Sequence, residues 1–244
     1  MDANELYDPE FRKLIRTAYS DGEPPPAIII PVGSLEQHGA HLPITTDSDI
    51  VTEIASRLAK KCNFVVLPTV SYGISFEHAP FFQVNIGLLS FLRDIISSLV
   101  INKVKSVIIL NGHHGNVGTL EIMEANPESN CPGISRKYFK DVKMDFYSYW
   151  HFMEHEFDHA GFVETSLMLA ISDKVKMKKA KKGLITKGLS EKEIQRIKKL
   201  STERGGFPKV TENGVWGDPT KATKKDGEKF LAEIVRNLAK ECQS

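Results

Sequence analysis

Two short segments of the sequence concentrate carboxylate and imidazole side chains. The first segment, residues 33–47, follows an apolar run, and its acidic and histidine residues are Glu36, His38, His41 and Asp47. The second segment, residues 111–116, follows another apolar run and contains His113 and His114. Carboxylate oxygens and imidazole nitrogens suit Zn²⁺, Mn²⁺ or Fe²⁺, and the lack of thiolates argues against a structural zinc site. The two segments therefore predict a catalytic metal centre.

The spacing of the acidic and histidine residues indicates how they would share metal ions. Glu36 and His38 are two residues apart, so in an extended segment both side chains point to the same side. Asp47 precedes an expected helix, and its two oxygens can bridge two cations; alternatively, it is only the N-cap of that helix. His113 comes from the neighbouring segment and can complete the coordination. Two ions roughly 3.5–4 Å apart can hold a hydroxide between them and polarise a carbonyl group.

The remaining histidines and the aromatic residues have structural alternatives. We expect His41 and His114 in the pocket or directly behind the ligands rather than as ligands. His78 either lines the pocket or forms a hydrogen bond in the core. Trp150 belongs to the aromatic segment 146–155, which either covers the pocket or packs in the core.

The elements around these segments predict an α/β fold. Apolar runs predict strands at residues 27–32, 64–67 and 106–110, and amphipathic patterns predict helices at 6–15, 49–59, 88–100, from about 116, and at 230–239. Strands that alternate with helices form a mainly parallel sheet with helices on both faces. In such sheets ligands bind at the carboxyl ends of the strands, where both ligand segments lie.

The composition indicates one soluble domain over residues 1–244. Hydrophobic residues make up 41% and charged residues 26% of the chain, and the net charge of +1 gives no reason to expect nucleic acid as a partner. Ten lysines between residues 174 and 199 are expected on a solvated surface with a short helix. No apolar run has the length of a membrane span, and the acidic N-terminus is no secretory signal. Three cysteines without a paired motif predict free thiols in the cytoplasm.

Four segments together resemble the creatininase (creatinine amidohydrolase) family, and the similarity runs from about residue 31 to residue 230. The segments are Gly33-Ser34-x-Glu36-Gln37-His38-Gly39-x-His41-Leu42-Pro43 with Thr46-Asp47, Asn111-Gly112-His113-x-Gly115-Asn116, His159-Ala160-Gly161-x-x-Glu164-Thr165-Ser166, and Gly214-x-x-Gly217-Asp218-Pro219. The resemblance implies a three-layer α/β/α fold, a homo-oligomer, and a hydrolase that uses two divalent metal ions, Zn, Mn or Fe, on amide C–N bonds.

The resemblance also implies roles for single residues. Glu36 and His113 would bind one metal ion and His38 the other, with Asp47 as the bridge. His159 would assist proton transfer at the scissile amide. On sequence alone, the segment that contains His159 also fits the capped start of a helix.

The roles of Glu164 and of the position of Gly115 remain open within the family pattern. Glu164 would either orient His159 or coordinate a metal ion. Creatininase proper has a glutamate at the position of Gly115, so here Glu164, water or substrate fills that place, or the second metal binds weakly. The family's Phe-Pro-Gly-Thr segment is also replaced, around residues 82–85. Both departures leave the substrate open.

The predicted activity is hydrolysis of a C–N amide bond in a small cyclic, creatinine-like amide by a metal-activated water. The family includes formamide hydrolases, so an alternative is a formamide hydrolase that acts on a formylamino-pyrimidine intermediate of riboflavin or deazaflavin biosynthesis. The family also includes processing peptidases for peptide-derived cofactors. An alternative of another class is a non-catalytic protein that binds a metal or a ligand.

Overall fold

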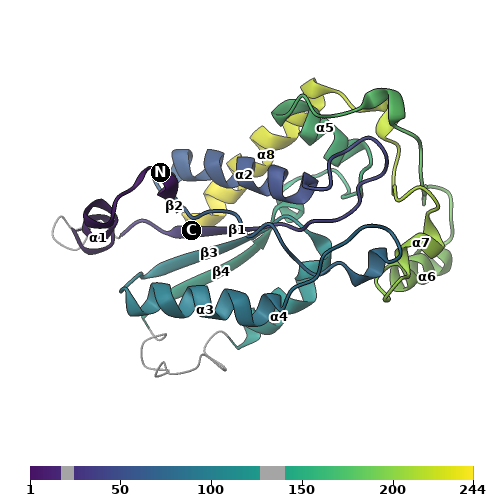
Figure 1. Cartoon of the computed structure of the whole chain (residues 1–244). Helices are drawn as coiled ribbons and strands as arrows, with labels where there is room; N and C mark the ends of the chain where they lie inside the picture. Colours follow the sequence, from purple (N-terminus) through teal and green to yellow (C-terminus); the bar gives the residue numbers. More distant parts are fainter. Residues whose placement is uncertain (18–24, 127–140, 244) are drawn as a thin grey trace.

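A parallel four-stranded sheet forms the centre of the molecule (Figure 1). The computed structural model describes residues 1–17, 25–126 and 141–243. The strands are β1 (Ile28–Val32), β2 (Val65–Val66), β3 (Ser106–Asn111) and β4 (Lys143–Ser148), in the order β2-β1-β3-β4. All three strand pairs are parallel. The predicted α/β class with a mainly parallel sheet is confirmed.

Helices cover both faces of this sheet, which gives three layers (Figure 1). One face carries α2 (Thr46–Cys62), α5 (Phe162–Ile171) and α8 (Lys224–Cys242), and the other carries α3 (Leu88–Ile101) and α4 (Val117–Ala125). The remaining helices are η1 (Ala3–Glu5), α1 (Asp8–Thr17), η2 (Phe76–His78), η3 (His114–Asn116), η5 (Tyr149–Phe152), η6 (Met177–Lys179), α6 (Glu191–Ser201), α7 (Phe207–Val210) and η7 (Pro219–Lys221).

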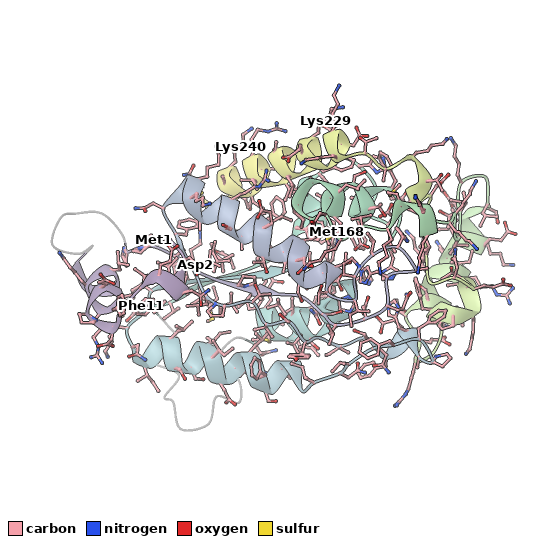
Figure 2. All side chains as sticks on the ribbon, turned by 45° about the horizontal axis from the view of Figure 1, so that its top comes forward. Met1, Asp2, Phe11, Met168, Lys229 and Lys240 are labelled. Atoms are coloured by element: carbon pink, nitrogen blue, oxygen red, sulfur yellow. The ribbon has the colours of Figure 1, made fainter. Side chains whose placement is uncertain are left out.

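Alternation along the strands explains why both faces are apolar. Ile29 and Ile108 belong to the cluster under α2, α5 and α8, whereas Ile28, Ile30 and Ile109 belong to the cluster under α3. Successive strand residues point to opposite faces, so an unbroken run of isoleucines builds two cores at once. Side chains fill the space on both sides of the sheet in Figure 2.

Helix α8 shows the corresponding pattern for a helix that has one buried face. Leu231, Ile234 and Leu238 are completely or almost completely buried. On the opposite face, Lys229 and Lys240 project away from the molecule (Figure 2). This spacing of apolar residues is that of a helix packed on a core, and the predicted C-terminal helix is present.

Several boundaries differ from the prediction. Helix α2 begins at Thr46, three residues before the expected start, and β2 is limited to Val65–Val66. Residues 143–148 form β4, although their mixed composition did not suggest a strand. In the described part of the chain, no helix has the length and apolar character needed to cross a membrane.

The register of the sheet brings the two ligand segments together. Val32 at the end of β1 pairs with Asn111 at the end of β3, and the Gly112 N–H donates to the Val32 carbonyl oxygen at 2.8 Å. The loops that leave these two strands therefore start side by side at the carboxyl edge of the sheet, as expected for ligand-binding loops in an α/β fold.

Candidate metal centre

Five predicted ligand candidates converge at this edge of the sheet from four different elements. Glu36 and His38 lie in the loop after β1, Asp47 in the first turn of α2, His113 directly after β3, and Glu164 in the first turn of α5. All five side chains are buried, with exposed fractions of 3% or less. Buried charged groups need partners or a metal ion, so this gathering calls for a chemical explanation.

Asp47 lies between two histidines. Its Oδ1 is 3.0 Å from His38 Nε2, and its Oδ2 is 3.0 Å from His113 Nδ1. Ser34 Oγ donates to the same Oδ2 at 2.9 Å, which holds the carboxylate in this orientation. The N-cap of α2 is Thr45, so Asp47 is not the simple helix cap that the sequence also allowed. Its two oxygens face two separate ligand groups.

Two groups that could each hold one metal ion share Asp47. One group consists of Glu36, Asp47 and His113, and the other consists of His38, Asp47 and Glu164; the ligand atoms of each lie within 4.8 Å of one another. Asp47 Oδ2 is 3.0 Å from His113 Nδ1, and Glu164 Oε2 is 3.6 Å from His38 Nε2. Ligands that bind one ion at 2.0–2.2 Å stand roughly 3.0–3.6 Å apart, so the spacing fits coordination.

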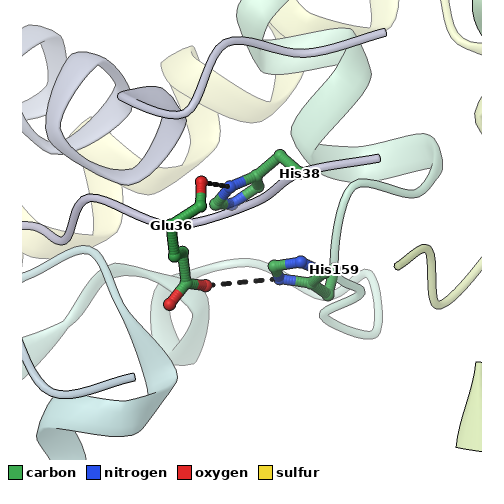
Figure 3. Close-up of side chains that lie close together, drawn as sticks. All are labelled: Glu36, His38 and His159. Carbon is green, nitrogen blue, oxygen red and sulfur yellow. Dashed lines mark hydrogen bonds and ion pairs between the residues drawn. The ribbon is translucent and has the colours of Figure 1, made fainter. Parts of the chain in front are cut away.

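Two further groups use Glu36 in other combinations. Glu36 forms one with His38 and His159, and another with Glu77 and His78. Glu36 Oε1 is 3.8 Å from His159 Nδ1 (Figure 3). The same oxygen is 3.2 Å from His78 Nε2. The Glu36 carboxylate thus lies close to His78, His113 and His159.

The Glu36 carboxylate provides the test of whether a metal ion fits. Both of its oxygens are buried, and among the described residues neither accepts a well-aligned hydrogen bond, although His78 Nε2 lies 3.2 Å from Oε1. Burial raises the pKa of Glu36 to about 7, although the neighbouring His113 favours the charged form. A buried carboxylate without well-aligned donors is costly, and a divalent cation coordinated by these oxygens would remove that cost. The donor set therefore fits a metal ion.

Hydrogen bonds to the main chain fix which nitrogen of each ligand histidine is free. A carbonyl oxygen only accepts, so His38 Nδ1 donates to the Glu36 carbonyl at 3.2 Å, and His113 Nε2 donates to the Ile74 carbonyl at 2.9 Å. When the histidines are neutral, the opposite nitrogens, which face Asp47, carry the lone pairs. This arrangement is typical of metal-binding histidines, whose second nitrogen donates to a carbonyl or carboxylate.

The charges of the metal-free site are balanced by protons on these histidines. Burial alone would lower the pKa of His38, but Asp47 and Glu164 outweigh it and raise the pKa to about 10. In the same way, Glu36 and Asp47 raise the pKa of His113 to about 10 against the effect of burial. Without a metal ion, both histidines are imidazolium ions at neutral pH. The carboxylates of each ligand group therefore favour a positive charge within that group.

Glu164 connects the second ligand group to the start of α5. Its Oε2 accepts a hydrogen bond from the Ala160 N–H at 2.6 Å and faces His38, while burial raises its pKa to about 8. The Asp158 carboxylate caps α5 by accepting the N–H groups of Val163 and Glu164 at 2.9 and 3.3 Å. The segment is thus a capped helix start, as one alternative proposed, and this start holds Glu164 against His38.

A cavity of about 380 Å³ opens next to the ligand groups. His78, His114, Trp150 and His159, which the sequence placed in or near a pocket, line it. His114 stacks on Trp150 with ring centroids 6.0 Å apart. His41 lies outside the lining that the described residues form, and it is hydrogen-bonded through Nε2 to Thr165 Oγ1 at 2.9 Å.

Several lining residues were missed by the sequence reasoning. Phe207 packs against the rings of His78 and His159 at centroid distances of 4.5 and 4.9 Å. Lys198 lines the cavity from α6, so the lysine-rich segment is more than the solvated surface that we expected. The amphipathic spacing of α6 could have indicated a packed helix, but no local signal shows which cavity a helix will border.

Glu77 occupies the space beside Gly115 that a side chain at position 115 would need. A Cβ atom on Gly115 would stand 2.7 Å from Glu77 Oε1 and 2.5 Å from His113 Nε2. Glu77 Oε1 itself lies 3.9 Å from His113 Nε2. The place of the missing family glutamate is therefore crowded by a carboxylate from η2, while Glu164 faces the second ligand group.

Comparisons with known proteins place the chain in a family. A sequence profile described as Creatininase: Creatinine amidohydrolase matches residues 15–242. The mycofactocin precursor peptide peptidase of Mycolicibacterium smegmatis is 32% identical over 231 residues, which cover 88% of this chain and 83% of the relative. The chain belongs to the creatininase family. It is a creatininase-family amidohydrolase, and this family consists of metal-dependent hydrolases of C–N bonds.

Two further relatives show how similarity is distributed within the family. The mycofactocin precursor peptide peptidase of Mycobacterium ulcerans is 31% identical over 230 residues, which cover 86% of this chain and 82% of that protein. The creatinine amidohydrolase of Pseudomonas putida is 29% identical over 172 residues, or 59% of this chain and 64% of that enzyme.

Solved creatininase structures share the fold of this creatininase-family chain. A crystal structure of creatinine amidohydrolase aligns with a TM-score of 0.76 at 24% identity and covers 98% of this chain and 95% of the other. A manganese form and a mutant of Zn-Zn type align with TM-scores of 0.76 and 0.77 at 23% identity. The three-layer architecture is therefore that of creatininase.

Proposed function

We propose that this protein hydrolyses an amide C–N bond with two divalent metal ions that share Asp47. The observation that carries the proposal is the position of the Asp47 carboxylate, with His38 3.0 Å from one oxygen and His113 3.0 Å from the other. One ion would be held by Glu36, Asp47 and His113, and the other by His38, Asp47 and Glu164. Zn²⁺, Mn²⁺ and Fe²⁺ all suit these ligands.

The metal ions and His159 would have different roles in the hydrolysis. When bound, two metal ions of this kind supply an activated water and polarise the substrate carbonyl. His159 borders the cavity with Nδ1 3.8 Å from Glu36 Oε1, and burial followed by the charge of His38 lowers its pKa well below the usual value. A neutral imidazole in this place can take a proton from the attacking water and pass it to the leaving nitrogen.

The cavity supports a small amide as the substrate. Its volume of about 380 Å³ lies in the range of small-molecule sites, and Trp150, Phe157 and Phe207 give it apolar walls. A cyclic, creatinine-like amide and a formamide both fit this description.

A peptide-derived amide is a second candidate, because the peptidase relatives match this chain over most of their length. The match covers 83% of the M. smegmatis peptidase, whereas it covers 64% of the P. putida creatinine amidohydrolase.

The test is release of amine or formate from three substrate types, a cyclic amide, a formamide and a short peptide, before and after metal is restored to chelated protein. We expect activity only with metal. A Glu36→Ala, His113→Ala double variant should lose at least about 10³-fold of the rate, since removal of such ligands abolishes the metal's contribution. The matched control, Glu121→Ala with His155→Ala, changes the same residue types at exposed positions.

Two results would contradict the proposal in different ways. Full activity of the Glu36→Ala, His113→Ala variant would eliminate the metal mechanism. Stoichiometric metal binding without hydrolysis of any substrate type would favour the alternative that the protein binds a metal ion but is not an enzyme.

A further inference from the structure

Gln37 lies between the ligand candidates Glu36 and His38, and its side chain reaches two other histidines. Gln37 Nε2 is 2.9 Å from His78 Nδ1 and 3.0 Å from His159 Nε2. The Gln37 carbonyl oxygen is 3.1 Å from the same His159 nitrogen. Gln37 is 9% exposed, so water does not replace these contacts easily. One side chain is thus in contact with both histidines that face Glu36 Oε1.

The main chain fixes the orientation of the Gln37 amide. Gln37 Oε1 accepts the Gly39 N–H at 3.0 Å, and Gln37 Nε2 donates to the Gly214 carbonyl at 3.2 Å. Rotation of the amide by 180° would place oxygen against oxygen and nitrogen against nitrogen. Gly214 has a φ of 70°, and a Cβ atom there would collide with the Gln37 amide. The glycine therefore permits this close approach.

The count of hydrogens then determines both histidine tautomers. The amide nitrogen has two hydrogens, and Gly214 takes one of them. If the second goes to His78 Nδ1, the remaining donor for the Gln37 main-chain carbonyl among the described residues is His159 Nε2–H, and every acceptor is satisfied. Gln37 Nε2 and His159 Nε2, 3.0 Å apart, then direct their hydrogens to these other acceptors. If the second hydrogen went to His159 Nε2 instead, His78 Nδ1 and the main-chain carbonyl oxygen of Gln37 would both lack a donor. Such unsatisfied acceptors are costly at a buried site.

We propose that Gln37 is a positioning residue that sets the tautomers of His78 and His159. His159 carries its proton on Nε2, so Nδ1 presents a lone pair toward Glu36 and the cavity. His78 carries its proton on Nε2 and presents N–H, not a lone pair, to Glu36 Oε1. His78 and His159 are thereby distinguished from the proposed ligands His38 and His113, whose free nitrogens face Asp47. The proposal rests on the proposed function for its consequence, proton transfer by His159.

The direct test is the ¹⁵N NMR spectrum of the histidine rings in zinc-loaded protein, which distinguishes protonated from unprotonated ring nitrogens. In the wild type we expect a protonated Nε2 and an unprotonated Nδ1 on both His78 and His159. In Gln37→Glu, the second carboxylate oxygen cannot donate, so His78 Nδ1 must take up a proton. The new carboxylate would also stand beside His159 Nε2–H and compete with the Gln37 main-chain carbonyl for it. Amide hydrolysis should therefore fall about 10–100-fold in kcat with a smaller change in KM, the scale of losing a residue that orients an active group.

Controls keep this result separate from a folding defect and from the proposed function. Gln83→Glu adds the same charge in the neighbouring loop and should leave the spectrum and kcat unchanged. Thermal unfolding of both variants shows whether the fold is retained. A wild-type spectrum with the His159 proton on Nδ1, or a Gln37→Glu spectrum that matches the wild type, would overturn the proposal. Because the spectrum requires no substrate, either outcome is independent of whether the protein hydrolyses amides.

Discussion

At the scale of single residues, the site holds more carboxylates than the main chain satisfies, and histidines compensate for them. Asp47 faces one histidine with each oxygen, and Glu36 has two buried oxygens that accept no well-aligned hydrogen bond from the described residues. Burial raises the pKa of a carboxyl group, while nearby imidazolium ions lower it. For Asp47 the two histidines outweigh burial, and its pKa lies well below the usual value.

This balance predicts that metal binding releases protons. The pKa of about 10 for His38 and for His113 means that both are protonated at pH 7 in the metal-free protein. Both must lose a proton to become ligands, and Glu36 and Glu164, whose pKa values burial raises to about 7 and about 8, must lose the protons that they carry at pH 7. Binding should therefore release more than two protons, up to about four. The apparent metal affinity should therefore rise with pH between 6 and 8. Calorimetry in buffers of different ionisation enthalpy measures the number, and pH-independent binding without proton release would contradict the charge assignment.

The residue types and their spacing were sufficient to predict Glu36, His38, Asp47 and His113 as neighbours. Each follows or precedes a strongly marked element, and parallel strands end at a common edge. Glu77 could not be predicted in the same way, because its place beside His113 depends on the path of the loop between β2 and α3.

At the scale of elements, the loop after β3 is packed against the loop that carries η2. Gly115 lies where these loops meet, and a Cβ atom there would run into the Ile74 carbonyl and approach Glu77 Oε1 to 2.7 Å. The first loop can therefore hold His113 in place only if position 115 has no side chain. This explains in steric terms why a glycine stands where creatininase proper has a glutamate.

Gly115→Ala should accordingly destabilise the protein and weaken metal binding. Overpacking of this kind costs typically about 1–3 kcal/mol, and the displaced group is the His113 imidazole, 2.5 Å from the new Cβ. The matched control is Gly118→Ala in α4, where a Cβ atom meets nothing within 4 Å; there we expect no loss of stability. Urea unfolding and metal titration of both variants provide the comparison, and equal stability of the two would refute the steric argument.

The strongly periodic elements were predictable and the mixed ones were not. Helix α3 begins at Leu88 as expected because its apolar residues follow the helical period without interruption. Strand β4 was missed because its residues alternate only partly and are half-buried at the edge of the sheet. Edge strands receive less burial, so their sequences carry a weaker signal.

At the scale of the whole molecule, one core supports the element that bears Asp47. Helix α2 packs on β1 and against α5 and α8, and the cluster between them includes Ile50, Ile54 and Leu238. The proposed ligands on α2 and α5 are thus positioned by the same core. The proposed metal site depends on the packing of this layer, although α8 contributes none of these ligands.

Truncation in this core should lower stability and leave the ligands in place. Leu238 is completely buried, so Leu238→Ala should cost about 2–5 kcal/mol of unfolding free energy, from lost burial and the cavity that remains. Ile122, which is 54% exposed on α4, provides the control as Ile122→Ala, with an expected change below about 0.5 kcal/mol. Chemical denaturation checks both values, and a loss of less than about 1 kcal/mol for Leu238→Ala would show that α8 is not integral to this core.

The most direct test of the shared role of Asp47 is anomalous diffraction from crystals of the metal-loaded protein. We predict two metal peaks per chain, roughly 3.5–4 Å apart, with Asp47 in contact with both. One peak should contact Glu36 and His113, and the other should contact His38 and Glu164. A single peak, or two peaks of which one lies away from Asp47, would contradict the proposal that two metal ions share this carboxylate.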